Sequence, residues 1–187
     1  MYSATFSALF HGTLSRNNGV AKLKRFVLSV LVENHAGVLS RVSGLFSRRG
    51  YNIDSLTVGE TYNPDRSRMT IVVRGDESTL EQIEKQLSKL VEVISIKHCE
   101  PSETVLRELA LIKVAVSGER RGVVIETANI FRAHIVDVGI DSLVIEVTGS
   151  EDKVARLIRL LEPFGIMELV RTGLTAMERG ADILGDA

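Results

Sequence analysis

The sequence predicts an α+β protein in which one order of elements, strand-helix-strand-strand-helix-strand, occurs twice. Short runs of alternating apolar residues, rich in valine, leucine and isoleucine, indicate half-buried strands. Stretches between them carry apolar residues three and four positions apart, the spacing of an amphipathic helix. The two copies lie on either side of a polar linker predicted at residues 100–105. Each order is that of a split β-α-β unit, so we expect two ferredoxin-like units, each with an antiparallel sheet and both helices on one face.

The first unit is predicted at residues 25–99. Its first helix begins after a turn, carries Val38 near its start and ends at Gly50, a typical C-terminal cap. A second helix is expected where Ser78 and Glu81 match a capping box. The expected strands are 25–33, 51–60, 68–74 and 91–99.

The second unit is predicted at residues 106–173. A helix is expected over 119–131, and Ser150 is the expected N-terminal cap of another helix that ends near Leu161. The residues from 174 to 187 show little periodicity, so we expect a mobile C-terminal tail. The expected strands are 108–116, 134–138, 143–148 and 166–171.

Residues 1–24 differ from the rest, because they contain basic residues and no acid precedes Glu33. A flexible N-terminal extension, or a start codon placed too early, is the expected interpretation. An organelle transit peptide is the alternative that this composition leaves open.

The composition excludes several classes of protein. Basic and acidic residues number 23 and 24, so the chain lacks the basic surplus typical of nucleic-acid-binding proteins. The single cysteine, Cys99, excludes an internal disulfide framework and a cysteine-based zinc site, and it fits a reducing cytoplasm. No apolar run approaches the roughly 20 residues of a membrane helix, so we expect a cytoplasmic protein.

The loop that joins the first strand to the first helix is the segment most informative about function. Amide groups at a helix start have no intrahelical partner, and Gly37 would let a ligand approach them closely. Asn34 in the loop and Asn52 at the start of the second strand offer side-chain amides. Together these groups can bind the carboxylate and ammonium of an amino acid. The alternative is an ordinary turn, because asparagine and glycine are common turn residues.

No pattern of catalytic residues occurs. The four histidines show no metal-ligand spacing, and neither a phosphate-binding glycine loop nor a nucleophile motif is present. We therefore expect no catalytic residues and no metal site in this chain. Apolar residues on the second and third strands, with few charges among them, predict contacts between copies of the chain; these are Ile53, Leu56, Val58, Met69, Ile71 and Val73.

The segments RFVLSVLVENHAGVLSRVSGLFSRRGYNIDSLTVGET and RMTIVVRGDESTLEQIEKQLSKLVEVI closely resemble the first half of acetohydroxyacid (acetolactate) synthase small subunits. ELALIKV, FRAHIVDV and LVRTGLTAMERG resemble the second half, so the resemblance covers roughly residues 24 to 180. It implies that the first unit is an ACT domain, which binds amino acids and pairs side by side with a second copy. The feedback site of the family maps onto Asn34, Gly37 and Asn52, with Val38 and Leu39 expected to shape the pocket.

The resemblance also implies a regulatory subunit without catalytic residues. It would activate the large catalytic subunit of acetolactate synthase and confer inhibition by a branched-chain amino acid, usually valine. Thiamine diphosphate, magnesium and FAD are expected on that catalytic subunit, and this chain is expected to bind none of them. His35 lies where the family loop varies, so it receives no role.

Three alternatives stay open at this point. One is a free-standing ACT-domain sensor that acts on another target. A second is RNA binding, because the RNA-recognition motif has the same element order; the predicted third strand, however, lacks the aromatic residues that stack on bases. The third, catalysis by the isolated chain, has the least support.

Overall fold

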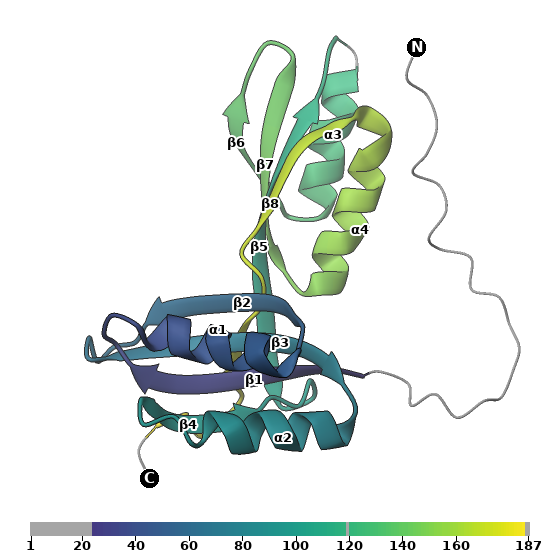
Figure 1. Cartoon of the computed structure of the whole chain (residues 1–187). Helices are drawn as coiled ribbons and strands as arrows, with labels where there is room; N and C mark the ends of the chain where they lie inside the picture. Colours follow the sequence, from purple (N-terminus) through teal and green to yellow (C-terminus); the bar gives the residue numbers. More distant parts are fainter. Residues whose placement is uncertain (1–23, 119, 186–187) are drawn as a thin grey trace, which may run out of the picture.

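The computed structural model describes residues 24–118 and 120–185, which form two units stacked along one long strand, β5 (Thr104–Ala115) (Figure 1). The predicted extension at 1–24 lies outside the described residues except for Lys24, the first residue of β1. β5 begins within the segment predicted as a linker and runs from the face of one unit into the sheet of the other.

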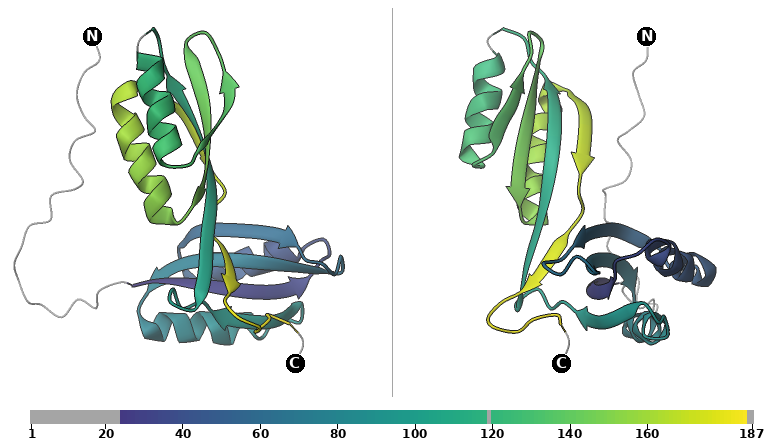
Figure 2. Two further views of the ribbon diagram at one scale, coloured as in Figure 1. Left: turned by 180° about the vertical axis from the view of Figure 1, so that it is seen from behind. Right: turned by 90° about the vertical axis from the view of Figure 1, so that its left-hand side faces the viewer.

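The N-terminal unit is a four-stranded antiparallel sheet with both helices on one face (Figure 2). Its strand order is β2-β3-β1-β4, so β2 and β4 are the two edges of the sheet. The element order and the helix positions agree with the predicted split β-α-β unit. Its elements are β1 (Lys24–Glu33), α1 (Val38–Arg49), β2 (Ile53–Glu60), β3 (Arg66–Gly75), α2 (Glu77–Leu87) and β4 (Val93–His98).

The core of this unit corrects one prediction. Met69, Ile71 and Val73 are almost fully buried beneath α1 and α2, and Ile53 and Leu56 pack partly against the same cluster. Full burial of such a side chain contributes about 1.5 to 3 kcal/mol, which explains why these residues face the helices of their own chain. They are therefore core residues, and the prediction that they contact another copy was wrong for the β3 residues.

The C-terminal unit repeats the architecture. Its sheet has the order β6-β7-β5-β8, and α3 and α4 cover one face of it (Figure 2). Besides β5, its elements are α3 (Arg120–Ile130), β6 (His134–Val138), β7 (Ser142–Gly149), α4 (Glu151–Leu161), a 3-10 turn at Glu162–Phe164 and β8 (Ile166–Arg171).

The helix starts confirm one predicted cap and correct another. Ser150 caps α4, since its hydroxyl accepts a hydrogen bond from the Lys153 amide, as predicted. α2, by contrast, is capped by Asp76, whose carboxylate accepts from the Thr79 amide at 2.8 Å. Ser78 lies inside the helix and donates to the same carboxylate, so the predicted capping box was wrong. Hydrogen bonds from Thr79 and Ser78 lower the pKa of Asp76 to about 2.

The segment after β8 is not an unstructured tail. It forms a short strand, β9 (Thr175–Glu178), which pairs antiparallel with the first residues of β5. Leu174 and Ala176 pack with Val27, Val72 and Cys99 on the face of the first sheet that the helices leave open. A four-residue strand with little apolar alternation gives no periodic signal, because its burial depends on a sheet that lies far away in the sequence.

Candidate functional site

The helix α1 begins at a glycine in the left-handed region. Gly37 has φ 94° and ψ −18°, and the space where a side chain would project contains no atom within 4 Å. No side chain caps this helix and its first turn has no acid, whereas α2 and α4 are capped by Asp76 and Ser150. The Val38 amide makes only a long 3.4 Å bond to the His35 carbonyl. The start of α1 is therefore an exposed, positively polarised group of amides.

Asn34 holds the loop in place. Its side-chain nitrogen donates to the Pro64 carbonyl at 2.7 Å and to the Glu60 carboxylate at 3.3 Å. Its side-chain oxygen accepts from the Ser67 hydroxyl at 2.9 Å, and its backbone amide donates to the Asp65 carbonyl at 2.8 Å. Asn34 thus ties the loop to the β2–β3 turn, and its side-chain oxygen has one lone pair left for a ligand.

Val38 and Leu39 play different parts. Val38 is 3% exposed as a whole residue and packs into the core, so its side chain does not face a ligand. The Leu39 side chain, in contrast, is 45% exposed on the first turn of α1. Of these two residues, Leu39 is the one whose side chain can offer apolar contact near the start of α1.

Asn52 lies at the other end of the sheet. It precedes β2, and its side-chain nitrogen donates to Asp54 Oδ1 at 3.1 Å. Asn34, by contrast, contacts Glu60, the last residue of β2. The seven residue steps from Ile53 to Glu60 correspond to roughly 23 Å of strand. One chain therefore does not bring the two predicted asparagines together.

His35 makes contacts that the sequence did not indicate. Its Nδ1 lies 3.1 Å from the Ala36 carbonyl and its Nε2 lies 2.9 Å from the Glu33 carboxylate. Both partners are acceptors, and only the protonated ring can donate from both nitrogens at once. The Ala36 carbonyl, followed by Glu33, raises the pKa of His35 above its usual value.

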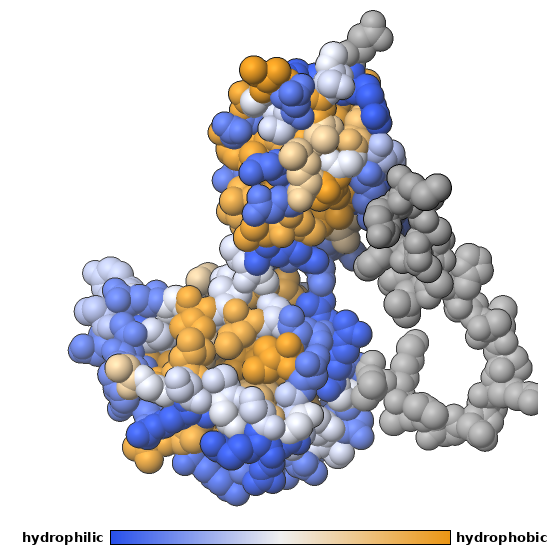
Figure 3. Space-filling model, turned by 45° about the horizontal axis from the view of Figure 1, so that its top comes forward, coloured by the Kyte–Doolittle hydropathy of each residue, from blue (hydrophilic) through white to orange (hydrophobic). Residues whose placement is uncertain are grey.

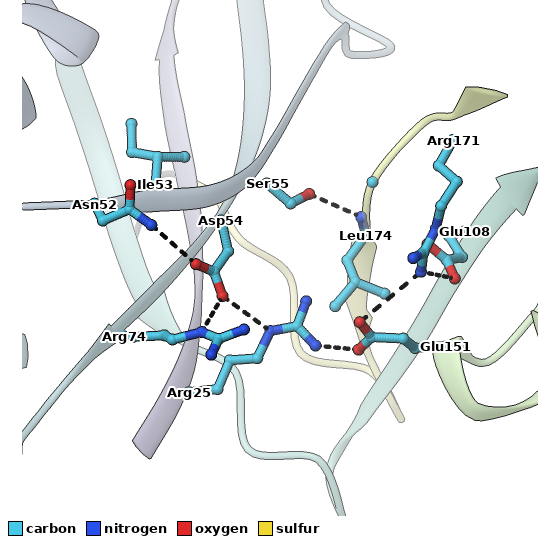
Figure 4. Close-up of a pocket in the computed structure, with 11 residues that line it drawn as sticks. Arg25, Asn52, Ile53, Asp54, Ser55, Arg74, Glu108, Glu151, Arg171 and Leu174 are labelled. Carbon is cyan, nitrogen blue, oxygen red and sulfur yellow. Dashed lines mark hydrogen bonds and ion pairs between the residues drawn. The ribbon is translucent and has the colours of Figure 1, made fainter. Parts of the chain in front are cut away.

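A cavity of about 530 Å³ at the junction of the two units also includes Asn52 (Figure 4). Sequence reasoning did not identify this cavity, because its walls come from both units and include contacts such as that of Arg25 with Glu151, 126 positions apart. On the face shown in Figure 3, hydrophilic and neutral residues lie between the two units, and each unit also carries apolar areas. The charged residues that line the cavity are Arg25, Asp54, Arg74, Glu108, Glu151 and Arg171.

The described part of the chain contains no group of three or more histidine, cysteine, aspartate or glutamate side chains arranged to hold a metal ion. Within residues 24–118 and 120–185, no helix is both long and apolar enough to cross a membrane. Cys99 is buried, and burial raises the pKa of its thiol.

The sequence matches two family descriptions that together span both units. Residues 107–180 match the small subunit of acetolactate synthase, and residues 28–95 match the ACT domain found in acetohydroxyacid synthase small subunits. A crystal structure of the acetolactate synthase small subunit from Thermotoga maritima superposes with a TM-score of 0.79. That protein is 43% identical, and the match covers 85% of this chain and 99% of its own.

Two relatives are similar along almost their whole length. The probable acetolactate synthase small subunit of Archaeoglobus fulgidus is 56% identical over 156 residues, which cover 83% of this chain and 98% of the relative. The acetolactate synthase small subunit of Mycolicibacterium smegmatis is 54% identical over 160 residues, or 86% and 94% of the two chains. The chain therefore belongs to the family of acetolactate synthase small subunits, and its first unit is an ACT domain of that family.

Proposed function

We propose that this chain is the regulatory subunit of a thiamine-diphosphate-dependent acetolactate synthase. It activates the catalytic subunit and makes that subunit sensitive to inhibition by branched-chain amino acids, with L-valine as the first candidate. The chemistry, with thiamine diphosphate, magnesium and FAD, belongs to the catalytic subunit. The observation that carries the proposal is the uncapped, exposed start of α1 at Gly37 in a chain of this family.

The effector site is completed by a second copy of the chain. β2 is an edge strand, and its Val58 side chain is 41% exposed. A two-fold axis perpendicular to the sheet joins two β2 edges into one continuous sheet, and identical strands related by such an axis are antiparallel. Antiparallel pairing places the start of one β2 beside the end of the other. Asn52 of one protomer then lies near the loop from Asn34 to Gly37 of its partner.

This arrangement suits a zwitterion with an apolar side chain. The carboxylate accepts hydrogen bonds from the first amides of α1 and gains about 0.3 to 1 kcal/mol from the helix dipole. The free lone pair of Asn34 can accept from the ammonium group. The exposed Leu39 side chain provides the apolar contact. The α1 amides and Asn34 recognise any α-amino acid, and the apolar contact favours a branched-chain one.

Binding inhibits the enzyme only when the effector prefers one of two arrangements of the regulatory dimer. The coupling is reciprocal, so the catalytic subunit and L-valine change each other's affinity by the same factor. A site between two protomers meets this requirement, since a change in how the β2 edges meet alters both its size and its contacts.

The Gly37→Asp variant tests the site. A side chain at φ 94° strains the loop, and a carboxylate there repels the effector carboxylate, so we expect activation to persist while L-valine inhibition weakens at least tenfold. Gly118→Asp is the matched control, because Gly118 also has positive φ and open space but lies in the other unit. Inhibition of both variants at wild-type L-valine concentrations would contradict the proposed site.

Affinity capture with the full chain separates the proposal from that of a free-standing sensor. We expect the chain to retain a large thiamine-diphosphate-dependent subunit from host extract and to raise its acetolactate formation when added back. Failure to bind or activate that subunit, together with intact L-valine binding, would favour the free-standing sensor.

A further inference from the structure

A continuous series of polar contacts leads from Asn52 into the C-terminal unit (Figure 4). Asn52 donates to Asp54 at 3.1 Å, and Asp54 lies 3.9 Å from the Arg25 guanidinium. Arg25 pairs with Glu151 at the start of α4, and Glu151 also faces Arg171 at 3.9 Å. The pair between Arg25 and Glu151 joins the two units directly, across 126 positions of sequence.

The chain after β8 is hydrogen-bonded to β2, the strand that contains Asp54. The Thr57 hydroxyl donates to the Thr172 carbonyl at 3.1 Å, and the Leu174 amide donates to the Ser55 hydroxyl at 3.2 Å. Gly173, between these two bonds, has φ 83°, and a β-carbon there would collide with the Ser55 hydroxyl. The close approach therefore requires glycine at this position.

β2 thus has two roles at once. Its unpaired side meets the second copy in the proposed dimer and so contributes to the effector site. Its side chains on the open face of the sheet bind residues 172–174. We infer that the contacts of Ser55 and Thr57 with residues 172–174, together with the ion pair of Arg25 with Glu151, transmit effector binding from Asn52 to the C-terminal unit. This inference rests on the proposed function and identifies positioning residues that lie outside the effector site.

The two states differ in the partner of Asp54. The Asn52 amide donates to Asp54 in the free chain; if it donates instead to the carboxylate of an effector in the shared site, Asp54 is left to the two arginines, Arg25 and Arg74. A closer bond between Arg25 and Asp54 weakens the contact of Arg25 with Glu151. Effector binding therefore changes how the C-terminal unit is held without any direct contact to it.

The variants Ser55→Ala and Glu151→Gln test the inference in the complete complex with the catalytic subunit. Each removes one junction contact and leaves the α1 amides, Asn34 and Asn52 unchanged. We expect calorimetric L-valine binding to the free chain within twofold of wild type, whereas the L-valine concentration for half-inhibition rises at least tenfold. Glu168→Gln is the matched control, since Glu168 pairs with Lys113 at 3.3 Å away from the junction, and it should be inhibited normally.

Wild-type inhibition of both junction variants would overturn the inference while leaving the proposed function intact. Loss of L-valine binding in both would also overturn it, because the contacts would then belong to the effector site. Absence of L-valine binding by the wild-type chain would instead contradict the proposed function, and the inference with it.

Amide hydrogen exchange gives a readout that does not depend on activity. The Leu174 amide reports its bond to Ser55 directly, and local opening sets its exchange rate. Because effector binding weakens the contact of Arg25 with Glu151, we expect saturating L-valine to speed this exchange about tenfold in the wild-type chain and to leave it unchanged in Ser55→Ala. An equal rate with and without L-valine in the wild-type chain would overturn the inference.

Discussion

At the scale of single residues, the backbone of Gly37 determines what α1 presents to solvent. A φ of 94° turns the chain into the helix without a capping side chain, so the first amides stay open. The neighbouring Asn34 is fixed by Pro64 and Ser67, both at least 30 positions later in the sequence. The local composition correctly predicted a turn that ends with Gly37 at the start of the helix. The partners of Asn34 could not be predicted from local spacing, because they lie far away in the sequence.

His35 offers a prediction at the same scale. Its two ring nitrogens face the Ala36 carbonyl and the Glu33 carboxylate, which raise its pKa. Because its pKa is raised in the folded protein, the protonated His35 ring stabilises the fold. This stabilisation is fully present below about pH 6.5 and is lost as pH rises through the pKa of His35 in the folded protein. An NMR titration should give His35 a pKa above 6.5.

Glu33→Gln should lower that pKa while the Ala36 contact keeps part of the shift, and Glu60→Gln is the control from the other side of the loop. A wild-type pKa at or below 6.5 would show that the ring does not donate to both acceptors in solution.

At the scale of secondary-structure elements, the two edges of the first sheet have different tasks. β2 is the edge that we assign to pairing with a second copy, and β4 is the opposite edge. Each carries one large apolar residue that is clearly exposed, Val58 at 41% and Ile94 at 37%. Similar exposure at the two edges means that the pairing has to be tested at both.

Val58→Asp should break the dimer, because a charge at a paired edge loses its hydration without gaining a partner. Sedimentation analysis is expected to show at least a tenfold weaker dimer and, with it, weaker L-valine binding. Ile94→Asp provides the matched control on β4 and should remain dimeric. If Ile94→Asp dissociated the dimer and Val58→Asp did not, the chains would pair through β4, and our assignment of the pairing to β2 would be wrong.

β9 leads to a prediction about Cys99. Leu174 and Ala176 cover this thiol on the open face of the first sheet, and its burial raises its pKa. Ending the chain after Gly173 should increase the rate of alkylation of Cys99 at least tenfold, because the thiolate becomes both accessible and easier to form.

Ending the chain after Gly180 keeps β9 and should leave the rate near that of wild type. Leu174→Ala, which removes a buried side chain at a cost of about 2 to 5 kcal/mol, should give an intermediate rate. Equal rates in all four chains would mean that β9 does not protect the thiol.

At the scale of the whole molecule, the sequence predicted both units but not how they are joined. Strand alternation and helical spacing give a local signal, so the repeated order of elements was predicted correctly. β9 was missed because its burial depends on Val27 and Val72 in the other unit. The junction was missed for the same reason, since Arg25 meets Glu151 and Ser55 meets Leu174 more than 100 positions apart.

The whole-molecule account depends on an effector site shared between two protomers. In one chain Asn52 and Gly37 lie at opposite ends of the sheet, and only a second copy brings such residues together. Gly37→Asp and Asn52→Ala should each abolish L-valine binding when every protomer carries the same change.

The most direct test uses a dimer that contains one Gly37→Asp protomer and one Asn52→Ala protomer, isolated through two different affinity tags. One of its two sites then carries both substitutions and the other carries neither. Calorimetry should therefore find one L-valine bound per heterodimer, with an affinity close to that of wild type. No binding by this heterodimer, although each wild-type dimer binds two, would contradict a site shared across the β2 edges.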